Sequence, residues 1–380
     1  MSFIPQEKFM RRAIELAKLG GGHVHPNPLV GAVIVRDGQI LAEGYHHKCG
    51  DLHAERDCLK NARESNVDVS GAEMYVTLEP CCHTGKQPPC TQAVIESGIK
   101  TVIIGSRDPN ELVNGKGVRH LEEAGVTVIQ DFLREECDAI NSIFFHYIKT
   151  KTPYVIVKYA MTADGKTSLS TGESKWITGD AARRNVHITR GTTSAVMCGI
   201  NTVLADDPML NCRVEGSRYR QPVRIVLDRK LELPLESNLV KTAGEIPVLV
   251  FTSKESMVSV SEAGKNILSG LGVEIIPVSE KDGHLNLEDV LAVLGEKKID
   301  SVFVESGGSL NASLFFSGEK CLVNEVHCYV APKITGGLNG GVHSPVQGVE
   351  CSSLDDCVKM KMIEVKNFGE DILIRYMICK

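Results

Sequence analysis

One histidine and two cysteines constrain this chain more than any other feature. His53 begins the run His-Ala-Glu, Cys81 follows a proline, and Cys90 comes after eight further residues. One imidazole and two thiolates match the protein ligands of a catalytic zinc ion, which keeps its fourth position for water. Zinc lowers the pKa of that water toward neutrality, and Glu55 supplies a carboxylate to move its protons. The fold therefore has to bring positions 53, 81 and 90 together.

This spacing predicts a chemistry as well as a metal. His-x-Glu followed by Pro-Cys and a second cysteine is typical of zinc deaminases that act on nucleobases. We therefore interpret Glu55 as the catalytic acid and base, with His53, Cys81 and Cys90 as metal ligands, in the removal of ammonia from a pyrimidine-like ring. The common form has two residues between the cysteines, whereas this chain has eight. Cys82 and His83 lie in that interval as competing ligands.

Composition narrows the class of protein. A chain of 380 residues favours two domains, and 42% hydrophobic with 24% charged residues is ordinary for a folded protein. The net charge of -6 opposes broad binding to nucleic acid or to an anionic membrane. Thirteen scattered cysteines, an odd number, favour reduced thiols. With no apolar segment of signal-peptide or membrane length, we expect a cytoplasmic protein.

The hydrophobic pattern predicts two α/β domains, residues 1–148 and 149–380, that meet near the seam at 146–153. Strands and helices alternate in both halves, which is typical of layered α/β sheets. We expect strands at 30–35, 39–43, 74–78, 101–104, 126–129, 154–159, 194–198, 223–227, 248–251, 273–278 and 301–304. We expect helices at 9–17, 53–62, 89–98 and 286–296. His53 and Cys90 then lie at helix starts, where negative charge is stabilised.

A second candidate site follows the apolar strand at 301–304. Glu305 ends this strand, and Gly307-Gly308-Ser309 begins a helix. Glycines allow a close backbone approach, and a helix N-terminus offers unpaired N–H groups to a phosphate, so a dinucleotide pyrophosphate fits here. The spacing is not the Gly-x-Gly-x-x-Gly of a doubly wound dinucleotide fold.

Several longer runs carry a family resemblance. They are Pro26–Gly31, His53–Glu55, Glu79–Cys90, Lys158–Lys166, Gly172–Thr178, Thr202–Pro208 and Glu305–Gly308. In these runs the chain resembles the bifunctional riboflavin-biosynthesis deaminase–reductases of bacteria, over nearly its full length. The resemblance implies a cytidine-deaminase-like α/β/α N-terminal domain and a dihydrofolate-reductase-like α/β C-terminal domain. It also implies that the long interval between the cysteines is usual, with serine more common where Cys82 stands.

The resemblance further implies the two reactions and their cofactors. The first is zinc-dependent hydrolytic deamination of 2,5-diamino-6-ribosylamino-4(3H)-pyrimidinone 5′-phosphate, and the second is NADPH-dependent reduction of the ribosyl chain to ribityl. Residues matching cofactor contacts are Ala160, Trp176, Thr202, Asp206, Gly307, Gly308 and Ser309. Residues matching substrate contacts are Asn27 and Lys86 in the first domain and Lys158, Ser174, Arg190, Leu210, Arg213 and Glu305 in the second. Arg190 and Arg213 suit paired binding of a phosphate.

The expected partner is a small pyrimidine ribosyl phosphate, without nucleic acid or membrane, and the resemblance implies a homo-oligomer. Two alternatives remain. A nucleic-acid-editing zinc deaminase with an accessory binding domain has the same zinc chemistry, but the acidic charge and the lack of basic-aromatic clusters oppose it. A zinc-stabilised scaffold that binds a partner needs a fourth protein ligand, such as Cys82 or His83.

Overall fold

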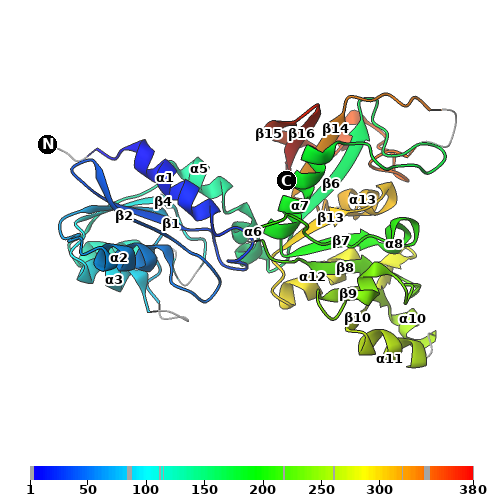
Figure 1. The fold of residues 1–380 in the computed structure, drawn as a ribbon, viewed down its shortest axis with the longest axis horizontal. Helices are drawn as coiled ribbons and strands as arrows, with labels where there is room; N and C mark the ends of the chain where they lie inside the picture. The colour runs from blue at the N-terminus through cyan, green and yellow to red at the C-terminus, as the bar shows by residue number, and fades with distance from the viewer. Residues whose placement is uncertain are drawn as a thin grey trace. The chain divides into compact units, whose positions relative to one another are not determined.

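Two larger β-sheets organise the chain, one in each of two compact units, Met1–Lys151 and Thr152–Lys380 (Figure 1). The computed structural model describes residues 4–83, 88–110, 113, 115–216, 219–259, 262–318, 320–337 and 343–379. None of the helices in these ranges is both long enough and apolar enough to cross a membrane. The sequence places the domain boundary between residues 148 and 149, which lie in the last helix of the first unit.

The first unit is a mixed sheet with helices on both faces. Its strands have the order β2-β1-β3-β4-β5 and are β1 (Gly31–Arg36), β2 (Gln39–Tyr45), β3 (Glu73–Leu78), β4 (Thr101–Ser106) and β5 (Thr127–Ile129). β1 pairs antiparallel with β2 and β3, whereas β3, β4 and β5 are parallel. The hairpin between β1 and β2 turns at Asp37 and Gly38, whose φ values of 52° and 74° suit a two-residue type I′ turn.

Side chains that alternate along the strands build a core on each face of this sheet. Val33, Val35 and Tyr75 pack with Phe9 and Met10 on one face. The other face carries a second core, which includes Ala32, Ile34, Met74, Val76, Cys58, Val94 and Leu121. The helices are α1 (Glu7–Lys18), α2 (Ala54–Glu64), α3 (Cys90–Glu96), α4 (Lys116–Glu123), α5 (Arg134–Ala139) and α6 (Ser142–Thr150). Figure 1 shows α1 and α5 on the face opposite α2 and α3, so the unit is a three-layer α/β/α fold.

A glycine lets helix α2 lie directly on strand β2. A Cβ atom at Gly44 would come within 2.2 Å of the Cys58 backbone nitrogen and 2.8 Å of the Ala54 carbonyl oxygen. This contact of backbone with backbone fixes the first turn of α2, which carries Glu55, and the N-cap residue His53.

The second unit is built on a nine-stranded sheet in the order β10-β9-β8-β7-β13-β6-β14-β16-β15. The strands are β6 (Tyr154–Thr162), β7 (Ala195–Gly199), β8 (Val223–Leu227), β9 (Val248–Ser253), β10 (Val273–Val278), β13 (Ser301–Glu305), β14 (Glu325–Ala331), β15 (Met360–Phe368) and β16 (Asp371–Ile378). Pairing is parallel from β10 to β14 and antiparallel from β14 to β15. Near-continuous apolar runs in β7, β8 and β9 are buried on both faces, as parallel strands usually are.

Helices connect and cover these strands. They are α7 (Asp180–Thr192), α8 (Ile200–Asp206), α9 (Asn238–Lys241), α10 (Lys254–Ser259), α11 (Glu262–Gly270), α12 (Leu287–Glu296) and α13 (Gly308–Phe315). A short hairpin, β11 (Glu280–Lys281) with β12 (His284–Leu285), and a 3₁₀ turn at Leu354–Asp356 complete the described elements. All the strands predicted from the sequence are present, and the two-domain α/β class is confirmed.

Candidate active sites

The three predicted metal ligands meet at one point of the first unit. His53 is the N-cap residue of α2, Cys81 lies just beyond β3, and Cys90 is the first residue of α3. His53 Nδ1 is 3.5 Å from the Cys81 sulfur and 3.4 Å from the Cys90 sulfur. The donor atoms all lie within 4.8 Å of one another, and neither Cys82 nor His83 belongs to this group. One imidazole and two thiols at this spacing fit three corners of a tetrahedral zinc site.

The two thiols of this cluster have pKa values that are shifted in opposite directions. A hydrogen bond from Cys90, opposed by burial and assisted by His53, lowers the pKa of Cys81 to about 4. The Cys81 thiolate and burial both raise the pKa of Cys90. Glu55 is buried at 3% exposure, and burial followed by the Cys81 charge raises the pKa of its carboxyl group. A glutamic acid that holds its proton more firmly than usual suits proton transfer.

A buried glutamate anchors the turn that carries Cys81. The Glu79 carboxylate accepts hydrogen bonds from the backbone nitrogens of Gly115 at 3.1 Å, Gly117 at 3.1 Å and Val118 at 3.4 Å. These are free N–H groups at the start of α4, where a negative charge is favoured. Sequence reasoning used Glu79 only as part of a family motif. The sequence did offer a signal for a structural role of Glu79, because it lies directly between an apolar strand and Pro80-Cys81.

Asn27 and His46 flank the same cluster. Asn27 Nδ2 lies 3.1 Å from His46 Nε2, and His46 Nδ1 lies 2.9 Å from the Leu52 carbonyl oxygen. The His46 ring meets the His53 ring edge-on, with centroids 5.4 Å apart. Asn27, which the sequence analysis expects to contact the substrate, therefore lies beside the cluster, and His46 is a neighbour that the sequence analysis missed. Lys86, the other predicted substrate residue of this unit, lies outside the described residues.

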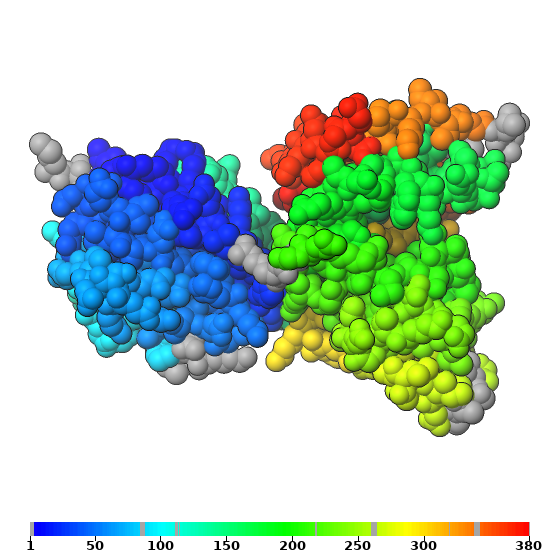
Figure 2. Space-filling view, viewed as in Figure 1, coloured from blue at the N-terminus to red at the C-terminus, as the bar shows by residue number. Residues whose placement is uncertain are grey.

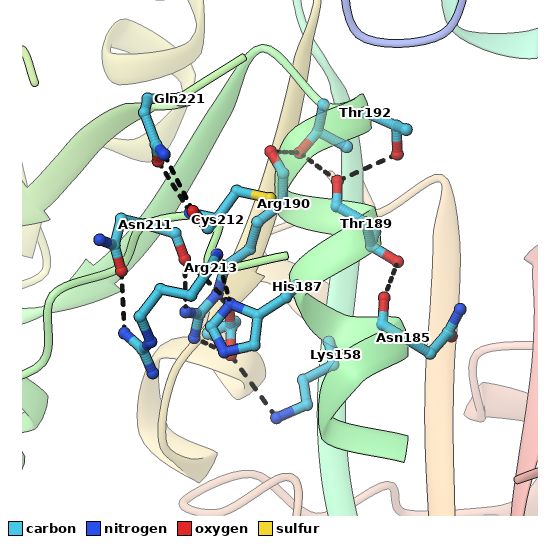
Figure 3. A network of polar contacts seen from close by, with 12 residues as sticks. Lys158, Asn185, His187, Thr189, Arg190, Thr192, Asn211, Cys212, Arg213 and Gln221 are labelled. Atoms are coloured by element: carbon cyan, nitrogen blue, oxygen red, sulfur yellow. Dashed lines mark hydrogen bonds and ion pairs between the residues drawn. The ribbon is translucent and has the colours of Figure 1, made fainter. Parts of the chain in front are cut away.

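The second site is centred on Glu305, at the carboxyl end of β13. The Arg190 guanidinium binds both carboxylate oxygens of Glu305, and Lys158 Nζ lies 3.6 Å from Oε2 (Figure 3). Burial raises the pKa of Glu305, but the charges of Arg190 and Lys158 outweigh it and bring the pKa to about 2. Glu305 is thus a largely buried carboxylate that stays ionised.

This pairing changes the interpretation of Arg190. Its Nε and Nη2 groups face Glu305, and its Nη1 donates to the Asn211 carbonyl oxygen at 3.0 Å. The edge of the guanidinium that would pair with a phosphate is therefore already used by a carboxylate. Arg213 has a more open guanidinium, whose Nη1 donates to Asn211 Oδ1 at 2.8 Å. Of the two guanidinium groups, that of Arg213 therefore makes fewer hydrogen bonds to the described residues.

His187 is a site residue that the sequence analysis missed. Its Nδ1 lies 3.1 Å from the Asn211 carbonyl oxygen. Burial, and then the charges of Arg190 and Arg213, lower the pKa of His187 to about 4. The imidazole is therefore neutral near pH 7 and faces the same cavity as both arginines.

A cavity of about 1750 Å³ unites the predicted residues of the second unit. Its lining includes Lys158, Ala160, Ser174, Trp176, Arg190, Thr202, Asp206, Leu210, Arg213, Glu305, Gly307, Gly308 and Ser309. In Figure 2, the α13 region lies recessed between the green segments of this unit. Trp176 is 62% exposed at the rim, with the Arg183 guanidinium 4.6 Å above its ring. Asp206 pairs with Lys175 at 2.9 Å.

The start of α13 fits a dinucleotide phosphate. Gly307 is the N-cap residue of α13, and a Cβ atom there would meet nothing within 4 Å. Its backbone is therefore open to the cavity. Gly308, in contrast, is required by packing, because a Cβ atom would come within 2.6 Å of the Ser344 carbonyl oxygen.

Comparison with known proteins identifies a family for each unit. Residues 4–106 match the cytidine and deoxycytidylate deaminase zinc-binding region, and residues 153–374 match the RibD C-terminal domain. The fold and sites thus define a two-domain protein that joins a zinc deaminase to a reductase. The riboflavin biosynthesis protein RibD of Actinobacillus pleuropneumoniae is 50% identical over 97% of this chain and 94% of its own length. The chain belongs to the RibD family of bifunctional deaminase–reductases in riboflavin biosynthesis.

Solved structures lead to the same family. RibD of Acinetobacter baumannii superposes with a TM-score of 0.84 at 35% identity, covering 98% of this chain and 99% of its own. A diaminohydroxyphosphoribosylaminopyrimidine deaminase/5-amino-6-(5-phosphoribosylamino)uracil reductase of Thermotoga maritima superposes with a TM-score of 0.84 at 40% identity, covering 98% of both chains. The cytidine-deaminase-like and reductase folds expected from the sequence are confirmed.

Proposed function

We propose that this chain catalyses two consecutive steps on one pyrimidine ribosyl phosphate. The first is hydrolytic deamination of 2,5-diamino-6-ribosylamino-4(3H)-pyrimidinone 5′-phosphate, and the second is reduction of the ribosyl chain of the product to ribityl. The Thermotoga maritima relative is named for a deaminase and a reductase of such pyrimidines, which supports this substrate. The observation that carries the proposal is the convergence of His53, Cys81 and Cys90 beside the buried Glu55.

In the first unit, His53, Cys81 and Cys90 are the residues that would hold zinc. Bound zinc supplies a water molecule of lowered pKa. Glu55 takes a proton on its carboxylate and delivers one to the departing ammonia. Its burial keeps bulk water from competing for that proton. Asn27, held beside His46, is placed to bind the pyrimidine ring.

In the second unit, the backbone N–H groups at the start of α13 and the rim residue Trp176 would hold NADPH, which supplies the hydride. Lys158, in the middle of β6, and Glu305, at the carboxyl end of β13, orient the sugar chain of the substrate. Arg190 keeps Glu305 ionised and in place. Arg213 binds the substrate phosphate with its exposed guanidinium.

The same proposal assigns deamination to residues 1–148 and reduction to residues 149–380. It places a homo-oligomer in the cytoplasm, with a small-molecule substrate and without nucleic acid or membrane as partner. The negative net charge supports the absence of nucleic acid and anionic lipid.

One incubation tests both steps. The purified chain with zinc is mixed with the diaminopyrimidinone ribosyl phosphate, ammonia is measured, and NADPH is then added while its absorbance is followed. We expect release of ammonia first and loss of NADPH absorbance second. Ammonia without NADPH oxidation would refute the second step, and no ammonia from zinc-loaded protein would refute the first.

A further inference from the structure

The segment Leu210–Arg213 crosses the edge of the second-unit cavity without belonging to a helix or a strand. Leu210 is buried and has a φ of 47°, in the left-handed region that leucine rarely adopts. Surrounding contacts must therefore hold this conformation. Arg213, at the end of the segment, is the arginine that the site leaves open for a phosphate.

Gln221 makes two of the contacts to this segment. Its Oε1 accepts a hydrogen bond from the Cys212 backbone nitrogen at 2.8 Å, and its Nε2 donates to the Cys212 carbonyl oxygen at 2.9 Å (Figure 3). The side-chain amide thus satisfies both backbone polar groups of one residue, as a neighbouring strand would. Gln221 is not among the described residues that line the cavity.

Helix α7 holds the same segment from the other side. His187 Nδ1 and Arg190 Nη1 both approach the Asn211 carbonyl oxygen, at 3.1 Å and 3.0 Å. Gly191 permits close packing, because a Cβ atom there would come within 3.0 Å of the Cys212 sulfur. The segment is therefore clamped between α7 and Gln221, one residue before Arg213.

We propose that Gln221 is a positioning residue of the reductase site. By fixing the backbone of Cys212, it sets the direction in which Arg213 presents its guanidinium to the phosphate of the substrate. This inference rests on the proposed function of the second unit. In this inference, Gln221 positions Arg213 for its contact with the phosphate, although Gln221 itself does not line the cavity.

The test compares Gln221→Met with the wild-type chain. Methionine keeps the length of the side chain and removes both hydrogen bonds, so we expect the KM for the ribosyl phosphate to rise about tenfold. The KM for NADPH and the rate of ammonia release should stay at wild-type values. Arg220→Lys is the matched control, since Arg220 is the adjacent residue and its Nη2 bonds Ser194 Oγ instead, at 3.0 Å. An unchanged KM in Gln221→Met would overturn the inference.

A double-mutant cycle with Arg213→Met separates positioning from general support of the fold. If Gln221 acts through Arg213, Gln221→Met should cause no further loss of affinity in the Arg213→Met chain. Fully additive losses would overturn the inference.

Binding can be followed without turnover through Trp176, the only tryptophan, which lies on the cavity rim. Titration with the ribityl phosphate product should give a dissociation constant about tenfold higher in Gln221→Met than in the wild type. The same constant in both chains would contradict the inference even if the variant were inactive. A wild-type chain that binds the product but never oxidises NADPH would instead refute the proposed function.

Discussion

In the proposed mechanism, the deaminase chemistry depends most on Glu55. Its carboxyl group is almost fully buried beside the three zinc-binding side chains, and burial raises its pKa. A proton held there is delivered to the substrate and not to bulk water. Glu55 is not one of the proposed metal ligands, so a mutation at this position can test proton transfer without removing the metal.

We expect Glu55→Gln to keep its zinc and to lose ammonia release by a factor of about 10² to 10⁴, the usual contribution of a general acid–base group. The amide has nearly the same size but cannot accept and return a proton. Metal content measured by elemental analysis, together with an ammonia assay, checks both halves of the prediction. Near-normal deamination in this variant would remove Glu55 from the mechanism.

Substitution of Cys82 tests the assignment of the zinc ligands. It lies next to a ligand in the sequence, but it is outside the group of donor atoms that converge. We therefore expect Cys82→Ser to retain both zinc and ammonia release, with Cys81→Ser as the matched control that loses them. A zinc-free Cys82→Ser protein would show that the ligands are assigned incorrectly.

The residues proposed to carry the zinc chemistry stand out in the sequence, and their convergence could be predicted, whereas the residues that support them could not. His53, Glu55, Cys81 and Cys90 form a spaced pattern that zinc chemistry explains. Glu79 acts on the backbone N–H groups of α4, and Gln221 acts on the backbone of Cys212. A contact with a distant backbone group leaves no spacing in the sequence, so only the fold reveals it.

At the scale of elements, the close packing of α2 on β2 places the deaminase ligands. The Gly44 backbone leaves no room for a Cβ atom against Cys58 and Ala54. The opposed atoms belong to the backbone, so a larger residue can be accommodated only by a shift of the whole helix.

We expect Gly44→Ala to weaken zinc binding and ammonia release, and to lower the free energy of unfolding by about 1–3 kcal/mol, as overpacking usually does. The second unit should reduce the deaminated intermediate at the normal rate when it is supplied directly. Gly244→Ala is the control, because its Cβ atom would meet nothing within 4 Å. Equal zinc affinity in both variants would contradict this account of the helix position.

A buried charge network joins strands β6, β14 and β16 of the second unit. Glu325, at the start of β14, accepts hydrogen bonds from Arg375 Nε at 2.7 Å, His327 Nε2 at 2.8 Å and the Tyr154 hydroxyl at 3.1 Å. Burial raises the pKa of Glu325, but His327 and Arg375 outweigh it and bring the pKa to about 2, from an ordinary 4.5. The stabilisation is therefore fully present above pH 4.5 and is lost as the pH falls toward 2.

We expect Glu325→Gln to lower the free energy of unfolding of the second unit by about 3 kcal/mol at pH 7, because Arg375 is left without its buried partner. The difference from wild type should shrink as the pH falls from 4.5 toward 2. Denaturant titrations that follow Trp176 fluorescence report on this unit. Glu364→Gln, which removes the exposed partner of Arg375, is the control and should cost little. A difference that stays constant with pH would contradict the network.

Many elements with a strong hydrophobic pattern were predicted, although the buried strand β14 was not. Strands β7, β8 and β9 have apolar runs that are buried on both faces, and the sequence shows them. The extent of helix α7 was not predicted, because Arg183, His187 and Arg190 face the cavity and its pattern resembles that of a solvated helix. Strand β15 was missed because nearly all its residues are exposed at the edge of the sheet, which removes the alternation that marks a strand.

At the scale of the whole molecule, each unit has its own sheet, its own core and its own site. Both sites lie where a parallel strand ends, after β3 in the first unit and after β13 in the second, where Glu305 pairs with Lys158 of β6. Loops at the carboxyl ends of parallel strands are a common location for ligands, because the strands fix their starting points. The sequence motifs are separated along the chain in the same way, which is why the two-domain organisation was predictable.

The size of the second-unit cavity bears on whether the two reactants of the reduction can be bound together. At about 1750 Å³ it exceeds the ~300–1,000 Å³ of a typical single-ligand pocket, so hydride donor and acceptor have room side by side. We expect a ternary complex, and hence double-reciprocal plots that intersect when one reactant is varied at several fixed levels of the other. Parallel lines would mean that each reactant occupies the cavity alone and leaves before the next arrives.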